Sequence, residues 1–518
     1  MAVLSNVLKG SVKITSRIKK LNITKPQNQQ KRVLIKLLTK ARSTKFGEAY
    51  GFDDILNQLL FEKGNNRFSA FKENVPIFDY NSLYEQWWQR CHKGEENICW
   101  PGKIKYFALS SGTSGSPSKH IPVSKEMIKA INRAGVNQII ALGNYDNLPE
   151  NLFDKSYLML GGSTQLAESE GRFEGDLSGI TTGNIPFWFE NFFKPGREIA
   201  QVKDWEQKLQ EITNNAPNWD IGFLAGVPAW IQILCERVIE KYNLKNIHEI
   251  WPNLSVYGWG GVSFEPYKNG FEKLMGKPMI YIETYLASEG FIAYQARPNA
   301  NLQLILNNGI FFEFVPFNED NFDENGDIKQ DAQTLLITEV EPDVDYALLI
   351  STCSGAWRYL IGDTVKFTDV AKCEIKITGR TKQFLSLCGE HISVDNLNNA
   401  VDAASKHFNI TIKEFTVTGI PHSPLFAHQW YIGTDDEIDE NELGRFIDKK
   451  LHELNDDYAV ERRHALKNVF CKVLPTASFL DYMKSKGKVG GQNKFPRVLK
   501  GARQAEWESY IFEKTLLV

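Results

Sequence analysis

The sequence predicts an α/β protein, with a large N-terminal α/β domain that carries appended β-barrel-like strands and a small mobile α+β C-terminal domain. Its 518 residues exceed the roughly 250–300 residues at which a single hydrophobic core stops growing. Strand-like and helix-like segments alternate between residues 157 and 282, and strands follow one another more closely after Ile310. Such alternation is typical of a largely parallel sheet covered by helices.

The composition excludes several classes of protein. Apolar residues make up 42% and charged residues 24% of the chain, which argues against a disordered, collagenous or coiled-coil protein. The net charge of -3 argues against nucleic-acid binding, because counterion release needs a basic face. Seven scattered cysteines without a Cys-x-x-Cys pair favour reduced thiols. With no apolar run long enough for a membrane span and no secretory signal, we expect a cytoplasmic monomer without membrane contacts.

The elements can be predicted in chain order. The first hundred residues are expected to be mostly helical, because apolar residues recur at helical spacing from Val33 to Leu38. A strand is predicted over 104–111, with Ser124 as the N-cap of the helix that follows. Further strands are predicted at 157–160, 254–257 and 279–282, and helices at 198–212, 229–242 and 266–274.

After Ile310 the pattern changes to closely spaced strands, as in an antiparallel barrel or sheet joined to the α/β core. These strands are predicted at 311–314, 335–340, 346–351, 365–367 and 375–378. A boundary is expected near 379–382, which gives domains 1–380 and 381–518. The second domain mixes a helix at 394–407 with strands at 414–418 and 429–433.

A hydroxyl-rich loop of sequence SSGTSGSPSK, residues 110–119, lies between a predicted strand and a predicted helix. Small residues let backbone N–H groups approach a polyphosphate, hydroxyls donate to its oxygens, and a lysine supplies charge. The loop is not the G-x-x-x-x-G-K-[ST] nucleotide loop, since no glycine precedes Lys119 and His120 follows it. An ordinary surface loop is the alternative, but the position favours phosphate binding. The candidate phosphate-binding residues are Ser110, Ser111, Thr113, Ser114 and Lys119.

Two further motifs follow predicted strands, where open α/β sheets bind ligands. Gly260 and Gly261 would let an adenine ring lie against the backbone, and Glu289 would hold Mg²⁺ on the phosphates unless it is an ordinary surface carboxylate. Asp363, in the run Tyr359–Asp363, is expected on a turn between strands. There it is suited either to accept both ribose hydroxyls or simply to cap the turn.

The order of these motifs resembles that of the adenylate-forming superfamily of acyl-activating enzymes and luciferases. Within it, the forms Ser-Ser-Gly-Thr-Ser…Lys, Tyr-x-x-Ser-Glu-Gly and Tyr-x-x-Gly-Asp are similar to those of the auxin-responsive acyl-acid amido synthetases and their microbial relatives. The runs 226–230 and 492–497 match that branch too. The resemblance spans roughly residues 106 to 497.

The resemblance implies an ATP- and Mg²⁺-dependent ligase. It would activate a small carboxylic acid as acyl-adenylate, release pyrophosphate, and pass the acyl group to an amine, expected to be that of an amino acid. The C-terminal domain would swing at the 380–382 hinge. The resemblance implies that Lys494 and Lys119 are catalytic lysines and that Glu289 binds the metal. It implies that ATP is bound by the loop residues and the two glycines named above, together with Tyr285, Ser288, Asp363 and Arg380.

Substrate identity is not specified by these motifs. Val227 and Trp230, with Leu142 and the run 185–189, are candidates for an apolar acyl pocket, and core packing is the alternative for each. The chain also departs from plant members, which usually have Gly at position 116 and Arg at position 360. Arg358 is expected to replace that missing charge. Two other functions stay open: an acyl-CoA-type ligase that uses a thiol, and a non-catalytic adenylate-fold binding protein.

Overall fold

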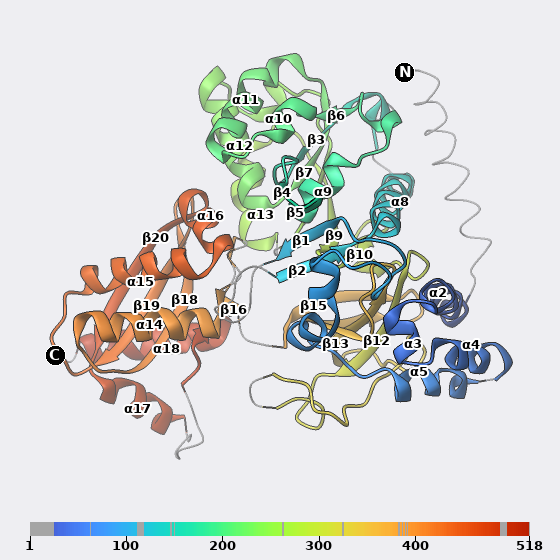
Figure 1. Ribbon diagram of the computed structural model, residues 1–518. Coiled ribbons are helices and arrows are strands. Elements are labelled where there is room, and N and C mark those ends of the chain that lie inside the picture. The colour runs from blue at the N-terminus through green and yellow to red at the C-terminus, as the bar shows by residue number, and fades with distance from the viewer. Residues whose placement is uncertain are drawn as a thin grey trace. The chain divides into compact units, whose positions relative to one another are not determined.

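The protein is described from a computed structural model. It describes residues 25–62, 64–110, 119–145, 148–149, 151–261, 264–323, 326–381, 384–385, 387–388, 390, 392–486 and 495–516. The chain forms two compact units (Figure 1). The first contains Met1–Ser110 and His120–Thr381, and the second contains Ser111–Lys119 and Lys382–Val518.

The first unit is built on a sheet of eleven described strands in the order β12-β13-β14-β15-β11-β10-β9-β8-β7-β3-β6 (Figure 1). Neighbours from β6 to β9 run parallel, and those from β9 to β12 run antiparallel. The predicted α/β fold class is confirmed. The strands are β3 (Ser156–Leu160), β6 (Phe193–Lys194), β7 (Ile221–Gly226), β8 (Val256–Gly260), β9 (Ile280–Ala287), β10 (Gly290–Gln295), β11 (Leu302–Leu304), β12 (Ile310–Pro316), β13 (Asp345–Thr352), β14 (Tyr359–Asp369) and β15 (Glu374–Arg380).

The strands after Ile310 continue this sheet, so the sheet form, one of the two alternatives that the sequence left open, is the one observed. One predicted strand, 335–340, is wrong. Leu335 makes only an isolated bridge with Phe314 of β12. The next residues turn instead, because the Glu339 carboxylate accepts the Leu336 N–H at 2.7 Å and the Leu336 carbonyl accepts the Glu339 N–H. Local hydrogen bonds of this kind compete with a strand ladder.

The N-terminal region is helical, as predicted. Its helices include α2 (Pro26–Ala41), α3 (Lys45–Ala49), α4 (Phe52–Phe61), α5 (Ser69–Asn74), α6 (Tyr80–Leu83) and α7 (Gln89–His92). A buried glutamine fastens α2 to β12: Gln30 Nε2 donates to the carbonyls of Leu306 (2.8 Å) and Ile310 (3.1 Å), and its Oε1 accepts from the Phe312 N–H (2.7 Å). A single side chain therefore satisfies three buried backbone groups.

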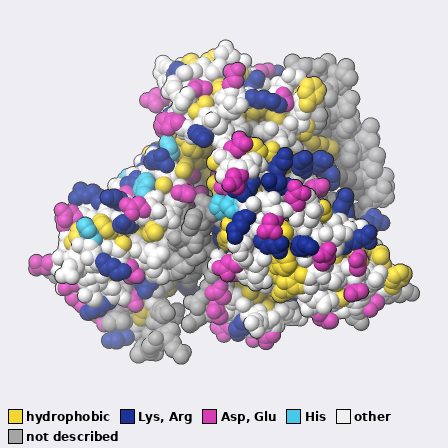
Figure 2. Space-filling view, in the orientation of Figure 1, with side chains coloured by type: hydrophobic (Ala, Val, Ile, Leu, Met, Phe, Trp, Pro, Cys, Tyr) yellow, Lys and Arg dark blue, Asp and Glu magenta, His cyan; other side chains and the backbone are white. Residues whose placement is uncertain are grey.

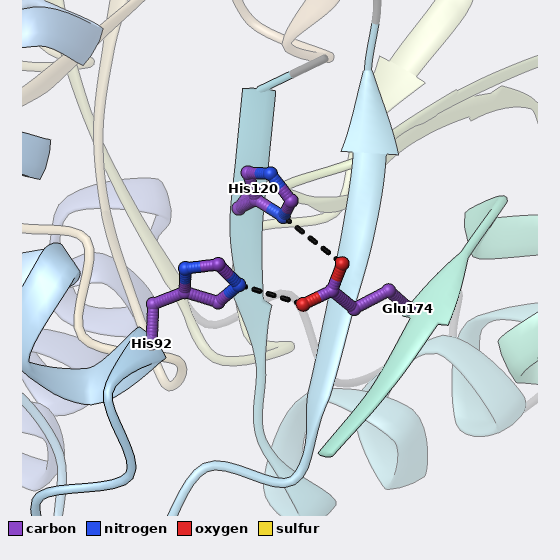
Figure 3. Close-up of side chains that lie close together, drawn as sticks. All are labelled: His92, His120 and Glu174. Carbon is purple, nitrogen blue, oxygen red and sulfur yellow. Dashed lines mark hydrogen bonds and ion pairs between the residues drawn. The ribbon is translucent and has the colours of Figure 1, made fainter. Parts of the chain in front are cut away.

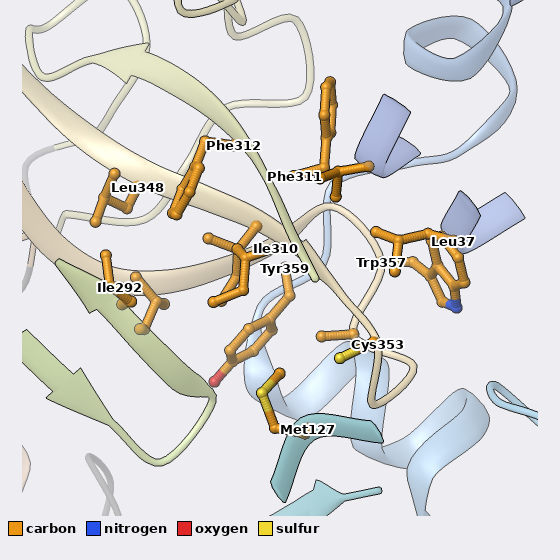
Figure 4. Close-up of a cluster of buried hydrophobic side chains, with 14 of the residues drawn as sticks. Leu37, Met127, Ile292, Ile310, Phe311, Phe312, Leu348, Cys353, Trp357 and Tyr359 are labelled. Carbon is orange, nitrogen blue, oxygen red and sulfur yellow. The ribbon is translucent and has the colours of Figure 1, made fainter. Parts of the chain in front are cut away.

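A hydrophobic cluster joins these helices to the sheet. Leu37 of α2, Met127 of α8 (Lys125–Ala141) and Trp357 pack with strand residues such as Ile310 and Tyr359 (Figure 4). The predicted N-cap is confirmed, since Ser124 Oγ accepts the Met127 N–H at 3.0 Å. The helix predicted at 198–212 is divided into α10 (Arg197–Gln201) and α11 (Trp205–Asn215), because Asp204 caps a new helix start. The helix α12 (Pro228–Tyr242) follows β7 directly.

A second, smaller sheet has the order β2-β1-β5-β4. Its strands are β1 (Tyr106–Ser110), β2 (Lys119–Val123), β4 (Ala167–Ser169) and β5 (Arg172–Gly175), and β1 runs parallel to β5. The hydroxyl-rich loop therefore connects the adjacent strands β1 and β2, and its residues 111–118 lie outside the described part of the chain.

The second unit holds a sheet of order β20-β19-β18-β21 with helices packed on it. The predicted helix and both strands are confirmed as α14 (Val394–Phe408), β18 (Ile412–His422) and β19 (Leu425–Thr434). The other described elements are β16 (Phe384–Leu385), β17 (Ile392–Ser393), α15 (Glu440–Leu454), α16 (Asp456–His464), β20 (Leu466–Leu474), α17 (Thr476–Ser485), β21 (Val498–Leu499) and α18 (Gly501–Leu516), with β16 and β17 paired in a small sheet of their own. Trp507 is fully buried among Phe479, Tyr482 and Phe495.

The surface and the thiols agree with the composition. Lysine and arginine side chains lie interspersed with aspartate and glutamate on the face shown in Figure 2. All seven cysteines are free thiols, and six are buried. Among the described residues, the helices are all too short or too polar to cross a membrane.

Candidate active site

The carboxyl ends of the parallel strands bring three predicted residues together. Gly260 ends β8, Gly261 follows it, and Val227 follows β7. A Cβ at Gly260 would lie 2.6 Å from the Thr284 carbonyl oxygen of β9, which only a glycine avoids. Gly261 has φ +84°, and a Cβ there would lie 3.9 Å from Val227 Cγ2. These glycines therefore leave bare backbone at the carboxyl edge of the parallel strands, where open α/β sheets generally bind ligands.

The β9–β10 hairpin presents the next group. Ser288 and Glu289 form the two-residue turn between β9 and β10, and Glu289 is 9% exposed. The hydroxyl of the buried Tyr359 makes a side-chain hydrogen bond with Glu289. Burial first, then the charge of Glu289, raises the pKa of Tyr359 well above its ordinary value. Tyr359 is therefore a neutral donor that fixes the Glu289 carboxylate.

Asp363 is held by two donors, one from β9 and one from β15, the strand next to its own. The Tyr285 hydroxyl of β9 donates to Asp363 Oδ2 at 2.5 Å, and Arg380 Nε of β15 donates to Asp363 Oδ1 at 2.6 Å. Burial, followed by the Asp363 charge, raises the pKa of Tyr285 well above its ordinary range. Burial alone would lower the pKa of Arg380, but the Asp363 carboxylate raises it. The Asp363 side chain is only 14% exposed, so its orientation is closely defined.

The expected turn at Asp363 is wrong, because this residue lies within the strand β14. Leu349 of β13 pairs with Leu360 and Ala347 pairs with Thr364, so the three residues Ile361–Asp363 stand opposite a single residue. Gly362 adopts φ +92° in this bulge. Bulges commonly redirect a side chain next to an active site, and this bulge accounts for the orientation of Asp363 toward Tyr285.

The expectation that Arg358 replaces a charge near a nucleotide is also wrong. Arg358 is 4% exposed, and its guanidinium makes hydrogen bonds of 3.0–3.2 Å to both carboxylate oxygens of Glu313. Its Nη1 donates to the carbonyls of Lys72 and Val75, each at 2.7 Å, and its Nη2 donates to Thr334 at 3.1 Å. The guanidinium is thus engaged in holding the N-terminal helices to β12.

The structure shows fewer contacts for the other predicted site residues. Ser110 ends β1 and Lys119 begins β2, whereas Ser111, Thr113, Ser114 and Lys494 lie outside the described residues. Trp230 is 4% exposed and stacks on Trp205 with ring centroids 4.3 Å apart.

Sequence reasoning missed several relationships. It did not find that Tyr359 fixes Glu289 or that Tyr285 and Arg380 hold Asp363, because these pairs are set by sheet register. It also gave His120 no role, although this side chain lies beside Glu174 and His92 (Figure 3). A histidine directly after the loop lysine was a visible signal, but its partners are 28 and 54 residues away.

Two solved structures share the fold of this chain over most of its length. The GH3.15 acyl acid amido synthetase matches with a TM-score of 0.56 at 17% identity, covering 96% of this chain and 95% of that one. 2-Hydroxyisobutyryl-CoA ligase, solved with 2-HIB-AMP and CoA, matches with a TM-score of 0.56 at 13% identity, covering 93% and 91%. The fold is the one that these two ligases share.

The family follows from the sequence comparisons. The GH3 family N-terminal domain matches residues 17–209 and 165–280, the central domain 303–380, and the C-terminal domain 395–503. The chain belongs to the GH3 family, which confirms the resemblance found in the motifs. Jasmonoyl–L-amino acid synthetases JAR6 and JAR4 of Nicotiana attenuata are 23% and 27% identical over 547 residues, each covering 90% of both chains. Indole-3-acetic acid-amido synthetase GH3.10 of Arabidopsis thaliana is 24% identical over 48% of this chain and 45% of its own.

Proposed function

We propose that this protein is an ATP-dependent acyl-acid amido synthetase. It activates a small carboxylic acid as acyl-adenylate and transfers the acyl group to an amine, that of an amino acid. The observation that carries the proposal is the Asp363 carboxylate held by Tyr285 and Arg380 beside Glu289, in a chain whose GH3 relatives are named amido synthetases.

In this proposal the nucleotide is held by a preorganised carboxylate. Tyr285 and Arg380 each occupy one oxygen of Asp363, and each oxygen keeps a further lone pair for a ribose hydroxyl. Because the two donors fix the carboxylate before ATP arrives, little orientational freedom is lost on binding. Gly260 and Gly261 leave a flat surface for the adenine, and Ser110 and Lys119 flank the loop proposed to contact the phosphates.

The same residues suit a magnesium ion. Two carboxylates, Glu289 and Asp363, act on the single guanidinium of Arg380, so the group carries more negative than positive charge. Glu289 offers the hard oxygen ligand that Mg²⁺ prefers, and Tyr359 orients it. When bound together with ATP, the ion supplies charge neutralisation on the phosphates.

The proposed reaction has two steps. In the first, a carboxylate oxygen of the acid attacks the α-phosphorus, and the bond from that phosphorus to the pyrophosphate oxygen breaks. In the second, the amine attacks the acyl carbon, the bond from that carbon to the AMP oxygen breaks, and the amine loses a proton to water or buffer. Lys119 and Lys494 are proposed to offset charge on the phosphates in the first step. Val227 and Trp230 are proposed to border the acyl group, with Trp230 positioned by Trp205.

The deciding experiment is ATP–pyrophosphate exchange with a panel of aromatic and aliphatic carboxylic acids. We expect exchange with at least one acid, followed by amino-acid-dependent release of AMP. Release that depends on coenzyme A instead of an amino acid would indicate a thioester-forming ligase. Nucleotide binding without exchange for any acid of the panel would indicate a binding protein and would contradict the proposal.

A further inference from the structure

Two histidines and one glutamate meet beside the smaller sheet of the first unit (Figure 3). His92 ends α7, His120 is the second residue of β2, and Glu174 lies in β5. Their ligand atoms all lie within 4.8 Å of one another. The three side chains are 20–23% exposed, so the group is held within the fold yet open to small ions.

The distances within this group suit a metal ion. Glu174 Oε1 lies 2.6 Å from His92 Nε2, and Glu174 Oε2 lies 3.5 Å from His120 Nδ1. Ligand atoms placed tetrahedrally at about 2.1 Å from a zinc ion are about 3.4 Å apart. The pair with His120 therefore already has this spacing, and the pair with His92 has to open by about 0.8 Å.

The charges and hydrogen bonds of the group are incomplete without a cation. Within the described part of the chain, the ion-pair partners of Glu174 are these two histidines, with no lysine or arginine. His120 Nδ1 is buried and makes no hydrogen bond to any described residue. Burial, then the neighbouring His92, lowers the pKa of His120, which favours a neutral ring with a lone pair to offer.

The rings are oriented by a second layer of contacts. The Tyr84 hydroxyl lies 3.0 Å from His92 Nδ1, and its ring stacks on that of Tyr80 with centroids 5.4 Å apart. The Tyr80 hydroxyl accepts the backbone N–H of His120 at 2.9 Å. The contact of Tyr84 with Nδ1 of His92 is of the kind that ordinarily fixes the ring of a metal-binding histidine, whereas Tyr80 holds the backbone of His120.

We propose that His92, His120 and Glu174 form a binding site for a divalent transition-metal ion of the zinc class. Two imidazoles and one carboxylate are a donor set that zinc uses, with a fourth position left for water. Glu289 is not a member of this group, and as an oxygen ligand it suits Mg²⁺. A bound ion links α7, β2 and β5, and so fixes the strand that begins with Lys119 directly after the hydroxyl-rich loop.

The test is zinc binding to the full chain after treatment with a chelator. Isothermal titration with zinc sulfate, in competition with a chelator of known affinity, should give one tight site per chain. His92→Gln, His120→Gln and Glu174→Gln should each weaken that site by at least about tenfold. Binding of cobalt(II), followed by its visible absorption, should be lost in the same variants.

His452→Gln is the matched control, because His452 Nε2 also lies near a carboxylate, 3.9 Å from Asp448 Oδ1, but in the second unit. This variant should keep the stoichiometry and the affinity of the wild type. Tyr84→Phe keeps the ring packing and removes only the hydroxyl, so it should fold normally and weaken zinc binding by about 10- to 100-fold. The proposal is overturned if the wild type shows no stoichiometric site, or if the ligand variants and Tyr84→Phe bind zinc like the wild type. Because the readout is metal affinity, its failure is independent of the amido synthetase proposal.

Discussion

Arg380 and Asp363 are direct cross-strand partners in β15 and β14, and Arg380 Nε donates to Asp363 Oδ1 at 2.6 Å. Arg380 is the last residue of β15, and the first unit ends one residue later at Thr381. The side chain that orients Asp363 therefore belongs to the last strand residue before the chain leaves this unit. In the proposed enzyme, the ribose-binding geometry is complete within the first unit and does not depend on the second.

Asp363→Ala should weaken ATP binding by roughly 10- to 100-fold, because a charge-assisted hydrogen bond to ribose is worth about 1.5–3 kcal/mol. Equilibrium binding of ATP to the folded variant measures this. Asp369→Ala is the control, since Asp369 ends the same strand but pairs with Lys372 at the surface, and it should leave ATP affinity unchanged. Unaltered affinity in Asp363→Ala would leave Asp363 with a structural role only.

Tyr285→Phe should weaken ATP binding less than Asp363→Ala, by about 5- to 10-fold, since it removes one donor to the carboxylate and keeps the ring. Because Tyr285 is proposed to act through Asp363, the double variant should bind ATP no more weakly than Asp363→Ala alone. A double-mutant cycle on ATP affinity checks this. Fully additive losses would mean that Tyr285 contributes to ATP binding independently of Asp363.

Lys494→Ala should depress pyrophosphate exchange by roughly two orders of magnitude, because an electrostatic contribution of about 3–4 kcal/mol to the adenylation transition state is lost. Aminolysis of a presynthesised adenylate should be nearly unchanged, since the lysine is proposed to act only in the first step. Lys486→Ala is the control: Lys486 lies eight residues before Lys494 in the sequence and pairs with Glu506 at 2.8 Å. An equal loss in both half-reactions, or a loss in neither, would contradict this role.

Arg358→Met should destabilise the protein by about 3–5 kcal/mol, because it leaves the carboxylate of Glu313, 1% exposed, buried without its partner. Thermal or urea unfolding of the full chain measures the change. Arg237→Met breaks an exposed pair with Glu206 and should cost at most about 1 kcal/mol. Equal destabilisation by the two variants would show that burial does not determine how much the Arg358–Glu313 pair contributes to the free energy of unfolding.

Glu390 should make the second unit sensitive to acid. Burial alone would raise the pKa of this carboxyl, but the hydrogen bond with His428 and that from the Cys388 N–H lower it to about 2. A carboxyl with a lowered folded pKa stabilises the fold above its unfolded pKa of about 4.5, and the gain is lost as pH falls toward 2. Glu390→Gln should therefore speed hydrogen exchange in β18 and β19 relative to the wild type at pH 6, and this difference should shrink at pH 3. A difference that does not shrink would contradict the linkage.

Much of the fold and part of the candidate site were predictable from the sequence, because the patterns that indicate them lie within short stretches of the chain. The alternation of strands and helices predicted the parallel part of the sheet, and the spaced motifs predicted Glu289, Asp363 and Arg380 as candidate site residues, which lie close together in the structure. The Tyr285–Asp363 hydrogen bond was not predictable, because it spans 78 residues and depends on the bulge at Ile361–Asp363.

The errors have a similar origin. Arg358 lies near Tyr359 in sequence, but its charge is satisfied by Glu313, 45 residues away. The histidine–glutamate group draws one residue from each of three separate elements, so no motif could reveal it. Long-range register and partner choice are decided by packing, which a single sequence does not display.

The hydrogen bonds of Gln30 help to protect an edge of the eleven-stranded sheet from pairing with another molecule. β12 is an edge strand, and an edge strand offers unpaired N–H and C=O groups through which two copies of a protein can join and aggregate. Gln30 engages the Ile310 carbonyl and the Phe312 N–H, and the backbone of Leu335 engages Phe314 further along the same edge. An amide side chain and one bridging residue thus occupy backbone groups of Ile310, Phe312 and Phe314 that a further strand would otherwise use, which makes this edge less available to a second molecule.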